Sequence, residues 1–283
     1  MVNQAHQHIS MKDFDAAEQA LHPALSLADE FREKYGQTQF CFNNGLELVF
    51  YIMLDEPDFG LASRNIPFSN VFQTYGFILM EKGRLDDALN MLDKGLLFNP
   101  VDAALHFEKA EVLKAQRRTS ELWEQIETCF EVSYLPHYIA RAYRNYGYYF
   151  IEAREWEAAA CCYFASQRWE HHIMAQGQLA YIRSAAGKPY QEKDYPPDVI
   201  DAILSKRQVP VKPCPLWPAA AIRVGADILS ENPANALMYF EIAYRLCPDR
   251  HIQAMIIKAK QKVQRQKMDD KTIIASHSES GQS

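Results

Sequence analysis

Two helices are predicted by residues 69–100, which read SNVFQTYGFILMEKGRLDDALNMLDKGLLFNP. In the first half, apolar residues recur at the i, i+3, i+4, i+7 spacing that gathers them on one helix face; they are Phe72, Tyr75, Gly76 and Leu79. Ser69 is expected to cap this helix, and Gly83 to end it in a left-handed turn. A second helix follows and stops before Pro100, with Leu85, Ala88, Leu89 and Leu92 on its inner face. Neither helix can bury its apolar face alone, so neighbouring helices must stack.

The pattern of this segment recurs along the chain. Thr74-Tyr75-Gly76-Phe77 stands 71 residues before Asn145-Tyr146-Gly147-Tyr148, and Ala17, Ala88 and Ala159 follow one another at the same interval of 71 residues. In both later copies a glycine precedes the alanine by 12 residues. Small residues at these two places would let the axes of paired helices approach closely, so the sequence predicts a helical repeat protein.

This arrangement resembles the tetratricopeptide repeat (TPR). The clearest copy meets the family pattern through Phe72, Tyr75-Gly76, Leu79, Ala88, Leu92 and Pro100, with Gly95 where alanine is usual. Residues 140–173 match through Tyr143, Tyr146-Gly147, Phe150, Ala159 and Tyr163. Residues 217–250 match in the second helix only, through Ala236, Phe240, Ala243 and Pro248, and residues 1–31 match despite Pro23.

The resemblance implies an all-α fold, a right-handed α-α superhelix, which is a TPR-like solenoid of antiparallel helix pairs. The resemblance extends to about residue 250 and implies about six units, and the expected repeat domain, with its insertion and capping helix, spans residues 1–267. Residues 40–54 and 103–136 are interpreted as degenerate units within it, and a charged loop over residues 55–60 replaces a normal second helix start.

A proline-rich insertion interrupts the pattern at residues 187–218, which hold seven of the 14 prolines. This insertion is expected to wrap the solenoid irregularly, with a short helix at 198–206 and Trp217 as its anchor. Residues 251–267 are expected to form a capping helix. The polar residues 268–283 are expected to be a disordered tail.

No pattern typical of catalysis, metal binding or a cofactor is found in the sequence. There is no G-x-G-x-x-G, and Gly187-Lys188 lacks the rest of a phosphate-binding loop. His171 and His172 would point about 100° apart on a helix, and the adjacent Cys161 and Cys162 lie among small residues typical of packing. The prediction is therefore no catalytic residue, no metal ligand and no cofactor, which favours a protein that is not an enzyme.

The resemblance also implies a binding surface, because the first helices of TPR pairs line a concave groove. Arg141, Arg144 and Tyr148 share one helix face, with Asn145 beside them. The predicted groove residues are Gln73, Phe77, Met80, Arg141, Arg144, Asn145 and Tyr148. Arginine suits a carboxylate, while tyrosine and methionine suit apolar side chains. The alternative is that these long side chains merely cover neighbouring helices.

Charge and cysteine usage limit the other classes of partner. The net charge of −6 disfavours nucleic-acid binding. A run of basic residues near the end of the final helix is interpreted as a solvated cap that complements the helix dipole; it consists of Lys258, Lys260, Lys262, Arg265 and Lys267. Six scattered cysteines predict reduced, mostly buried thiols. No secretory signal or membrane-spanning stretch is visible, so a cytoplasmic protein without membrane contact is expected.

These observations favour a non-catalytic scaffold or adaptor that binds a protein or peptide segment, with a carboxylate as one recognised group. One alternative is a structural subunit that acts through self-association. A second alternative is an RNA-binding or enzymatic function on a TPR scaffold.

Overall fold

The computed structural model describes residues 1–36, 39–55, 62–63 and 66–280. Within these ranges the chain is all-α, except for a two-residue parallel pairing of β1 (Gln39–Phe40) with β2 (Ala62–Ser63). The chain forms two compact units rather than the single domain expected over residues 1–267. The first unit comprises Met1–Tyr51 and Asp55–Cys214, and the second comprises Ile52–Leu54 and the chain from Pro215 onward.

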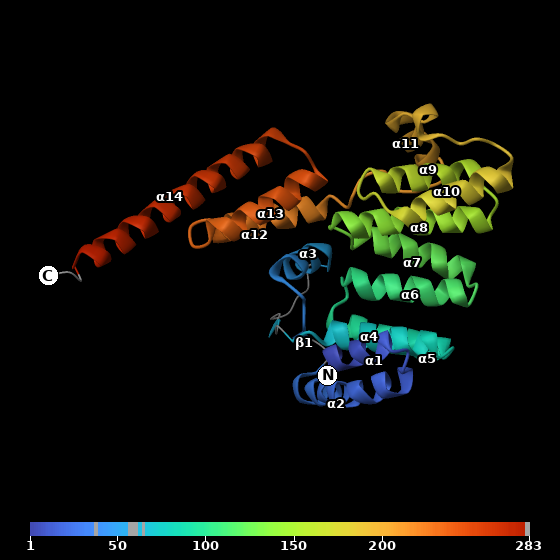
Figure 1. Ribbon diagram of the computed structural model, residues 1–283, viewed down its shortest axis with the longest axis horizontal. Helices are drawn as coiled ribbons and strands as arrows, with labels where there is room; N and C mark the ends of the chain where they lie inside the picture. Colours follow the sequence, from blue (N-terminus) through green and yellow to red (C-terminus); the bar gives the residue numbers. More distant parts are fainter. Residues whose placement is uncertain (37–38, 56–61, 64–65, 281–283) are drawn as a thin grey trace. The chain divides into compact units, whose positions relative to one another are not determined.

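Four helix pairs make up most of the first unit, and Figure 1 shows the later ones stacked in chain order. The pairs are α1 (Val2–Ser10) with α2 (Phe14–Tyr35), α4 (Phe68–Glu81) with α5 (Leu85–Phe98), α6 (Ala103–Ala115) with α7 (Thr119–Glu131), and α8 (Pro136–Glu152) with α9 (Trp156–Gln167). Each second helix also packs on the next pair, because neither member covers its apolar face alone. α10 (Ile173–Ala186) then packs on α9. The predicted stacking of helix pairs is confirmed.

The regular interval of 71 residues has a different cause from the one expected. Ala17 and Ala88 lie on α2 and α5, which belong to successive pairs, because α2 packs directly on α4. Ala88 and Ala159 lie on α5 and α9, with the α6–α7 pair between them. The first interval therefore contains one stacking step and α3 (Gly45–Asp55), and the second contains two steps. The prediction that residues 40–54 form a degenerate stacking unit is wrong.

Glycines set the spacing of helices within and between pairs. A Cβ at Gly76 would lie 2.7 Å from Leu92 Cδ2, and one at Gly147 would lie 2.6 Å from Tyr163 Cε2. The predicted close approach of the paired helices at these glycines is thus confirmed. Gly95 is equally constrained, because a Cβ there would lie 2.7 Å from Phe72 Cβ. This contact explains a glycine where the repeat pattern usually has alanine.

The start of α4 differs from the prediction, whereas its end agrees. The helix begins at Phe68, so Ser69 lies inside its first turn, where it is buried and its hydroxyl has no hydrogen-bond partner. Phe68 packs against Phe31 and Phe98 at 5.4 and 4.8 Å between ring centroids, and this aromatic packing draws it into the helix. Gly83 adopts the expected positive φ of 74°.

The proline-rich segment wraps the α9 side of the first unit, as expected. It contains a 3-10 turn, η1 (Glu192–Asp194), and α11 (Pro197–Ser205), which buries Ile200 and Leu204. Tyr143 Oη on α8 donates to the Pro210 carbonyl oxygen at 2.9 Å. Trp217 is fully buried, but it belongs to the first turn of α12 (Leu216–Ile228) in the second unit. The expected burial of Trp217, at the end of the proline-rich segment, is therefore confirmed.

A buried polar cluster fixes the start of α3 in the first unit. Glu47 is 5% exposed and accepts hydrogen bonds from the Asn43 backbone N–H at 3.0 Å and from Asn99 Nδ2 at 2.7 Å. Asn44 Oδ1 accepts from the backbone N–H of Leu46 and of Glu47, both at 3.0 Å, and so caps the helix. The loop expected at 55–60 lies, apart from its first residue, outside the described residues.

The second unit contains α12, α13 (Pro233–Leu246) and α14 (Arg250–Ser280). A Cβ at Gly225 would lie 2.7 Å from Phe240 Cε1, so α12 and α13 meet as α4 and α5 do. The first helix here thus carries a repeat feature that the sequence pattern did not identify. α14 packs on α13 and continues past residue 267, so the expectation of a disordered tail from residue 268 is not met as far as Ser280.

Several smaller observations bear on chemistry. Cys41, Cys129, Cys161 and Cys162 are buried, and burial raises the pKa of the Cys161 thiol to about 12. No helix in the described part of the chain is long and apolar enough to cross a membrane. Over the same residues, no cluster of three or more His, Cys, Asp or Glu side chains could hold a metal ion.

Candidate ligand-binding groove

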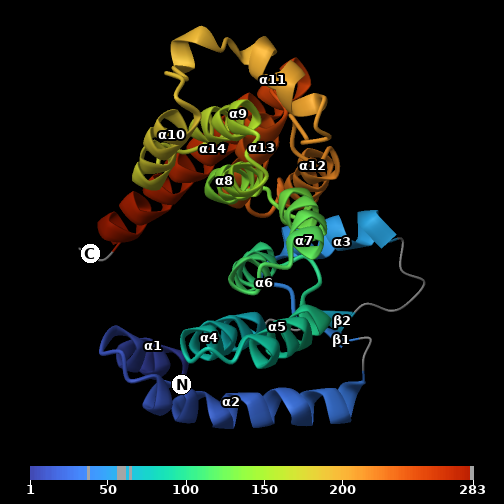
Figure 2. The same cartoon turned by 90° about the vertical axis from the view of Figure 1, so that its right-hand side faces the viewer.

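The first helices of successive pairs line one continuous face of the first unit. Figure 2 shows α1, α4, α6, α8 and α10 following one another along the same side of this unit. Side chains from these helices surround two cavities, and Glu108 of the first cavity contacts Arg141 of the second, with Arg141 Nη1 and Glu108 Oε1 3.4 Å apart. The two cavities are therefore neighbours on one face, which we call the groove.

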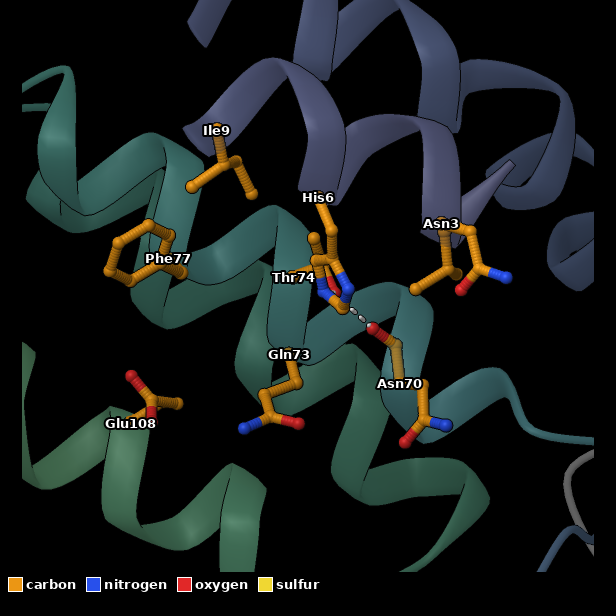
Figure 3. Close-up of a pocket in the computed structure, with 9 residues that line it drawn as sticks. Asn3, His6, Ile9, Asn70, Gln73, Thr74, Phe77 and Glu108 are labelled. Atoms are coloured by element: carbon orange, nitrogen blue, oxygen red, sulfur yellow. Dashed lines mark hydrogen bonds between the residues drawn. The ribbon is translucent and has the colours of Figure 1, made fainter. Parts of the chain in front are cut away.

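The first cavity of the groove has a volume of about 490 Å³ and lies among α1, α4 and α6. Figure 3 shows side chains from all three helices around it: Asn3, His6 and Ile9 from α1, Asn70, Gln73, Thr74 and Phe77 from α4, and Glu108 from α6. Thr74 Oγ1 donates to the Asn70 carbonyl at 2.7 Å, so it accepts from His6 Nε2 at 3.2 Å. The wall of this cavity combines the side-chain amides of Asn3, Asn70 and Gln73 with the ring of Phe77 and the carboxylate of Glu108.

The second cavity is larger, about 740 Å³, and lies among α6, α8, α9 and α10. Its lining residues are Glu111, Lys114, Ala115, Arg141, Arg144, Asn145, Tyr148, Tyr163, His172, Met174 and Gln178. It carries four charged side chains, Glu111, Lys114, Arg141 and Arg144, whereas the first cavity carries Glu108 alone. Met174 and Tyr148 supply apolar surface next to these charges.

The charges of the second cavity are paired within the protein. Arg141 contacts both Glu108 and Glu111 at 3.4 Å, and Lys114 Nζ lies 2.9 Å from Glu111 Oε1. Arg144 Nη1 contacts Glu170 Oε2 at 3.2 Å. The two arginines therefore face different carboxylates in the structure, although they share one face of α8.

Burial and pairing compete in setting the protonation of these groups. Burial raises the pKa of Glu108, and Arg141 opposes this effect without overcoming it. Burial also acts to raise the pKa of Glu111, but Lys114 and Arg141 overcome it and hold that pKa below its usual value. Burial lowers the pKa of Lys114 despite its pairing with Glu111. The groove is thus a partly desolvated surface, where electrostatic interactions are stronger than in water.

Asn145 is the polar group of the groove whose hydrogen bonding is incomplete. It is 3% exposed, and its Oδ1 accepts from Lys114 Nζ at 2.7 Å. Its Nδ2 is buried and has no hydrogen-bond partner among the residues that the structure describes. A buried amide donor without a partner is costly, and the residue borders the second cavity. A ligand oxygen placed there could accept from it.

The predicted groove residues divide between the two cavities. Gln73 and Phe77 line the first, and Arg141, Arg144, Asn145 and Tyr148 line the second. Met80 is half-buried on α4 but lines neither of these cavities. The structure therefore brings six of these seven side chains to one face.

Sequence reasoning missed the groove residues of α1, α6 and α10. α6 carries Glu108, Glu111 and Lys114, at a spacing of three residues that repeats along one side of a helix. This spacing could have identified them, but the repeat at 103–136 was interpreted only as degenerate. The contribution of α1 has no comparable signal, because it depends on how the first pair stacks against α4.

Comparisons with known proteins found similarity among solved structures and in neither of the other two searches. No family model matches the chain, and no curated protein matches it. Among solved structures, the chain is similar to YrrB, described as a TPR protein with an unusual peptide-binding site, with 14% identity, a TM-score of 0.36, and coverage of 78% of this chain and 100% of YrrB. It is also similar to a TPR protein from Parabacteroides merdae ATCC 43184, with 12% identity, a TM-score of 0.41, and coverage of 92% and 97%. Both are described as TPR proteins.

Proposed function

We propose that the groove binds a protein or peptide segment and that the protein acts as a non-catalytic scaffold or adaptor. The observation that carries this proposal is the unpartnered Nδ2 of Asn145, buried at the edge of the second cavity. Backbone carbonyls of an extended segment are regularly spaced acceptors that can take such a donor. The adjoining cavities extend over six helices, which suits a chain better than a compact small molecule.

A carboxylate on the bound segment is the finer part of this proposal. Arg144 contacts Glu170 through a single pair of atoms at 3.2 Å, and the Glu170 side chain is about one third exposed. A ligand carboxylate could replace Glu170 and form the two parallel hydrogen bonds that a guanidinium group favours. Arg141 is less available, because it already bridges Glu108 and Glu111.

Selection of ligands from a library of random 12-residue peptides, followed by calorimetry, tests the proposal. Asn145→Ala should weaken the selected peptides about fivefold or more, since a lost hydrogen bond costs about 1 kcal/mol. Asn235→Ala, at an exposed position of α13, is the matched control and should leave affinity unchanged. Peptides that bind both variants as well as the wild type would place the binding site elsewhere.

Self-association is the second candidate function, favoured by the exposed apolar side chains of Ile173 and Tyr181 on α10. Sedimentation equilibrium separates the two. A stable dimer together with failure to select any peptide would favour the structural subunit.

The buried thiols of Cys129, Cys161 and Cys162 suit a reducing compartment such as the cytoplasm.

A further inference from the structure

The outward side of α14 carries a run of cations that the helix end does not explain. Between His251 and Met268 the sequence has five lysines and arginines and no acidic residue, although the whole chain has a net charge of −6. Interaction with a helix dipole is confined to the last turn. Because α14 continues to Ser280, Lys267 lies more than three turns before its end. The interpretation of these residues as a dipole-complementing cap is therefore wrong.

One face of α14 is used for packing within the second unit. Ile252 and Ala259 are buried, and Met255 and Ile256 pack against a core that includes Phe240. These residues lie at helical spacing on the same side of α14. The opposite side is therefore left for solvent or for a partner.

That opposite side carries a seam with coiled-coil spacing. Its positions follow one another at intervals of three and four residues: Ala254, Ile257, Gln261, Gln264 and Met268. All are exposed, and Ile257 and Met268 are 52% and 69% exposed. This alternation keeps the seam facing a second helix along its length.

Cations flank the seam on both edges. Lys258 and Arg265 follow seam residues on one edge, while Lys260 and Lys267 precede seam residues on the other. All four are exposed, and within the described residues their one ion pair joins Lys260 to Glu241 at 3.9 Å. In coiled-coil nomenclature these four occupy the e and g positions, which select the partner by charge.

We propose that this face of α14, the 254–268 seam with its four flanking cations, binds an acidic amphipathic helix of a partner protein. Two copies of α14 would bring like charges together in either orientation, because both edges are positive, so pairing with a second copy is disfavoured. A partner helix with an apolar seam would cover the exposed Ile257 and Met268. Glutamate or aspartate on both edges of that helix would pair with the four cations.

The same features disfavour two other anionic partners. The seam lacks aromatic side chains that could stack on nucleic-acid bases. Its centre holds Gln261 and Gln264, whereas a helix lying on an anionic membrane buries a broad apolar face. Both partners are nevertheless arms of the test.

The experiment uses the full chain and a fluorescent synthetic helix of three heptads, with leucine at a and d and glutamate at e and g. Anisotropy at 100 mM NaCl should show binding at least tenfold tighter than to the same helix with lysine at e and g. The variant K258E/K260E/R265E/K267E should reverse this preference. The matched control K94E/K188E/K193E/K206E changes four exposed lysines elsewhere and should retain it.

A second variant separates the seam from simple charge attraction. Ile257→Lys leaves all four flanking cations in place and should weaken the acidic helix about tenfold, with circular dichroism confirming that each variant is folded. Three results would overturn the proposal. They are equal binding of a scrambled acidic peptide, tighter binding of a 20-nucleotide single-stranded RNA, and tighter binding of vesicles containing phosphatidylserine.

Discussion

The groove of the first unit and the outer face of α14 both present cations, but they use them differently. In the groove, Arg141 and Arg144 each lie within 3.5 Å of a glutamate oxygen, so their charges are neutralised before any ligand arrives. On α14, the described residues offer Lys258, Arg265 and Lys267 no acidic partner, and Lys260 one at 3.9 Å. Removing a paired and partly buried charge leaves its partner uncompensated and lowers stability, whereas removing an exposed charge without a partner has little effect on folding. Substitutions at the two places should therefore have different effects.

The largest effect is expected at the most connected groove cation. Arg141→Ala removes the partner of Glu108 and one partner of Glu111, and leaves the partly buried Glu108 carboxylate without its ion pair. We expect the free energy of unfolding in urea to fall by about 2 kcal/mol, less than when one member of a fully buried pair is lost. The double variant Arg141→Ala/Glu108→Gln should lose less than the sum of the single changes. Additive losses would show that the pair is not coupled.

An effect no larger than that of Arg141→Ala is expected from the packing that holds α8 in place behind the groove. Gly147→Ala would put a Cβ 2.6 Å from Tyr163 Cε2, so the ring must move and the protein should lose about 2 kcal/mol of stability. Gly177→Ala is the matched control, because no atom lies within 4 Å of its Cβ position on α10. That change should raise stability by about 0.5–1 kcal/mol, since alanine favours the helix. A loss at Gly177 or none at Gly147 would contradict the assigned packing.

The smallest effect on stability is expected on α14. Arg265→Ala removes an exposed cation that has no ion pair among the described residues, and the free energy of unfolding should change by less than about 0.5 kcal/mol. The melting temperature of this variant, compared with that of Arg141→Ala, is the direct measure of the contrast. If Arg265→Ala lost as much stability as Arg141→Ala, the outer face of α14 would contribute to the stability of the fold.

The repeat architecture could be predicted because it depends on local patterns. The positions of Gly76 and Gly147 relative to their alanines indicate close helix contacts, and both glycines meet a large side chain of the next helix. The same contact at Gly225 was missed, because there the glycine precedes Ala236 by 11 residues instead of 12. A search for one fixed spacing misses a copy of the repeat in which the glycine and the alanine are one residue closer together.

The number of stacking steps and half of the groove could not be predicted. The segment of α3 has the length of a repeat helix. Only the tertiary packing shows that α2 packs directly on α4, so that α3 is not a stacking step. Spacing along α8 placed Arg141 and Arg144 on one face correctly. Their partners Glu108 and Glu170 come from other parts of the chain, and a single-helix pattern carries no information about them.

In the folded chain the Glu47 carboxylate, at the start of α3, binds a proton at a pH closer to neutrality than a glutamate does in the unfolded chain. Burial raises the pKa of Glu47 to about 7, hydrogen bonding from Asn99 opposes this rise, and nearby Asp102 adds to it. Since an unfolded glutamate has a pKa of 4.5, the folded chain holds a proton between these values that the unfolded chain releases. The contribution to stability is complete below pH 4.5 and is lost as pH rises towards 7, at up to about 1.4 kcal/mol per pH unit. The attachment of α3 would thus loosen on the alkaline side of neutrality, and Glu47→Gln would remove this dependence of the unfolding free energy on pH.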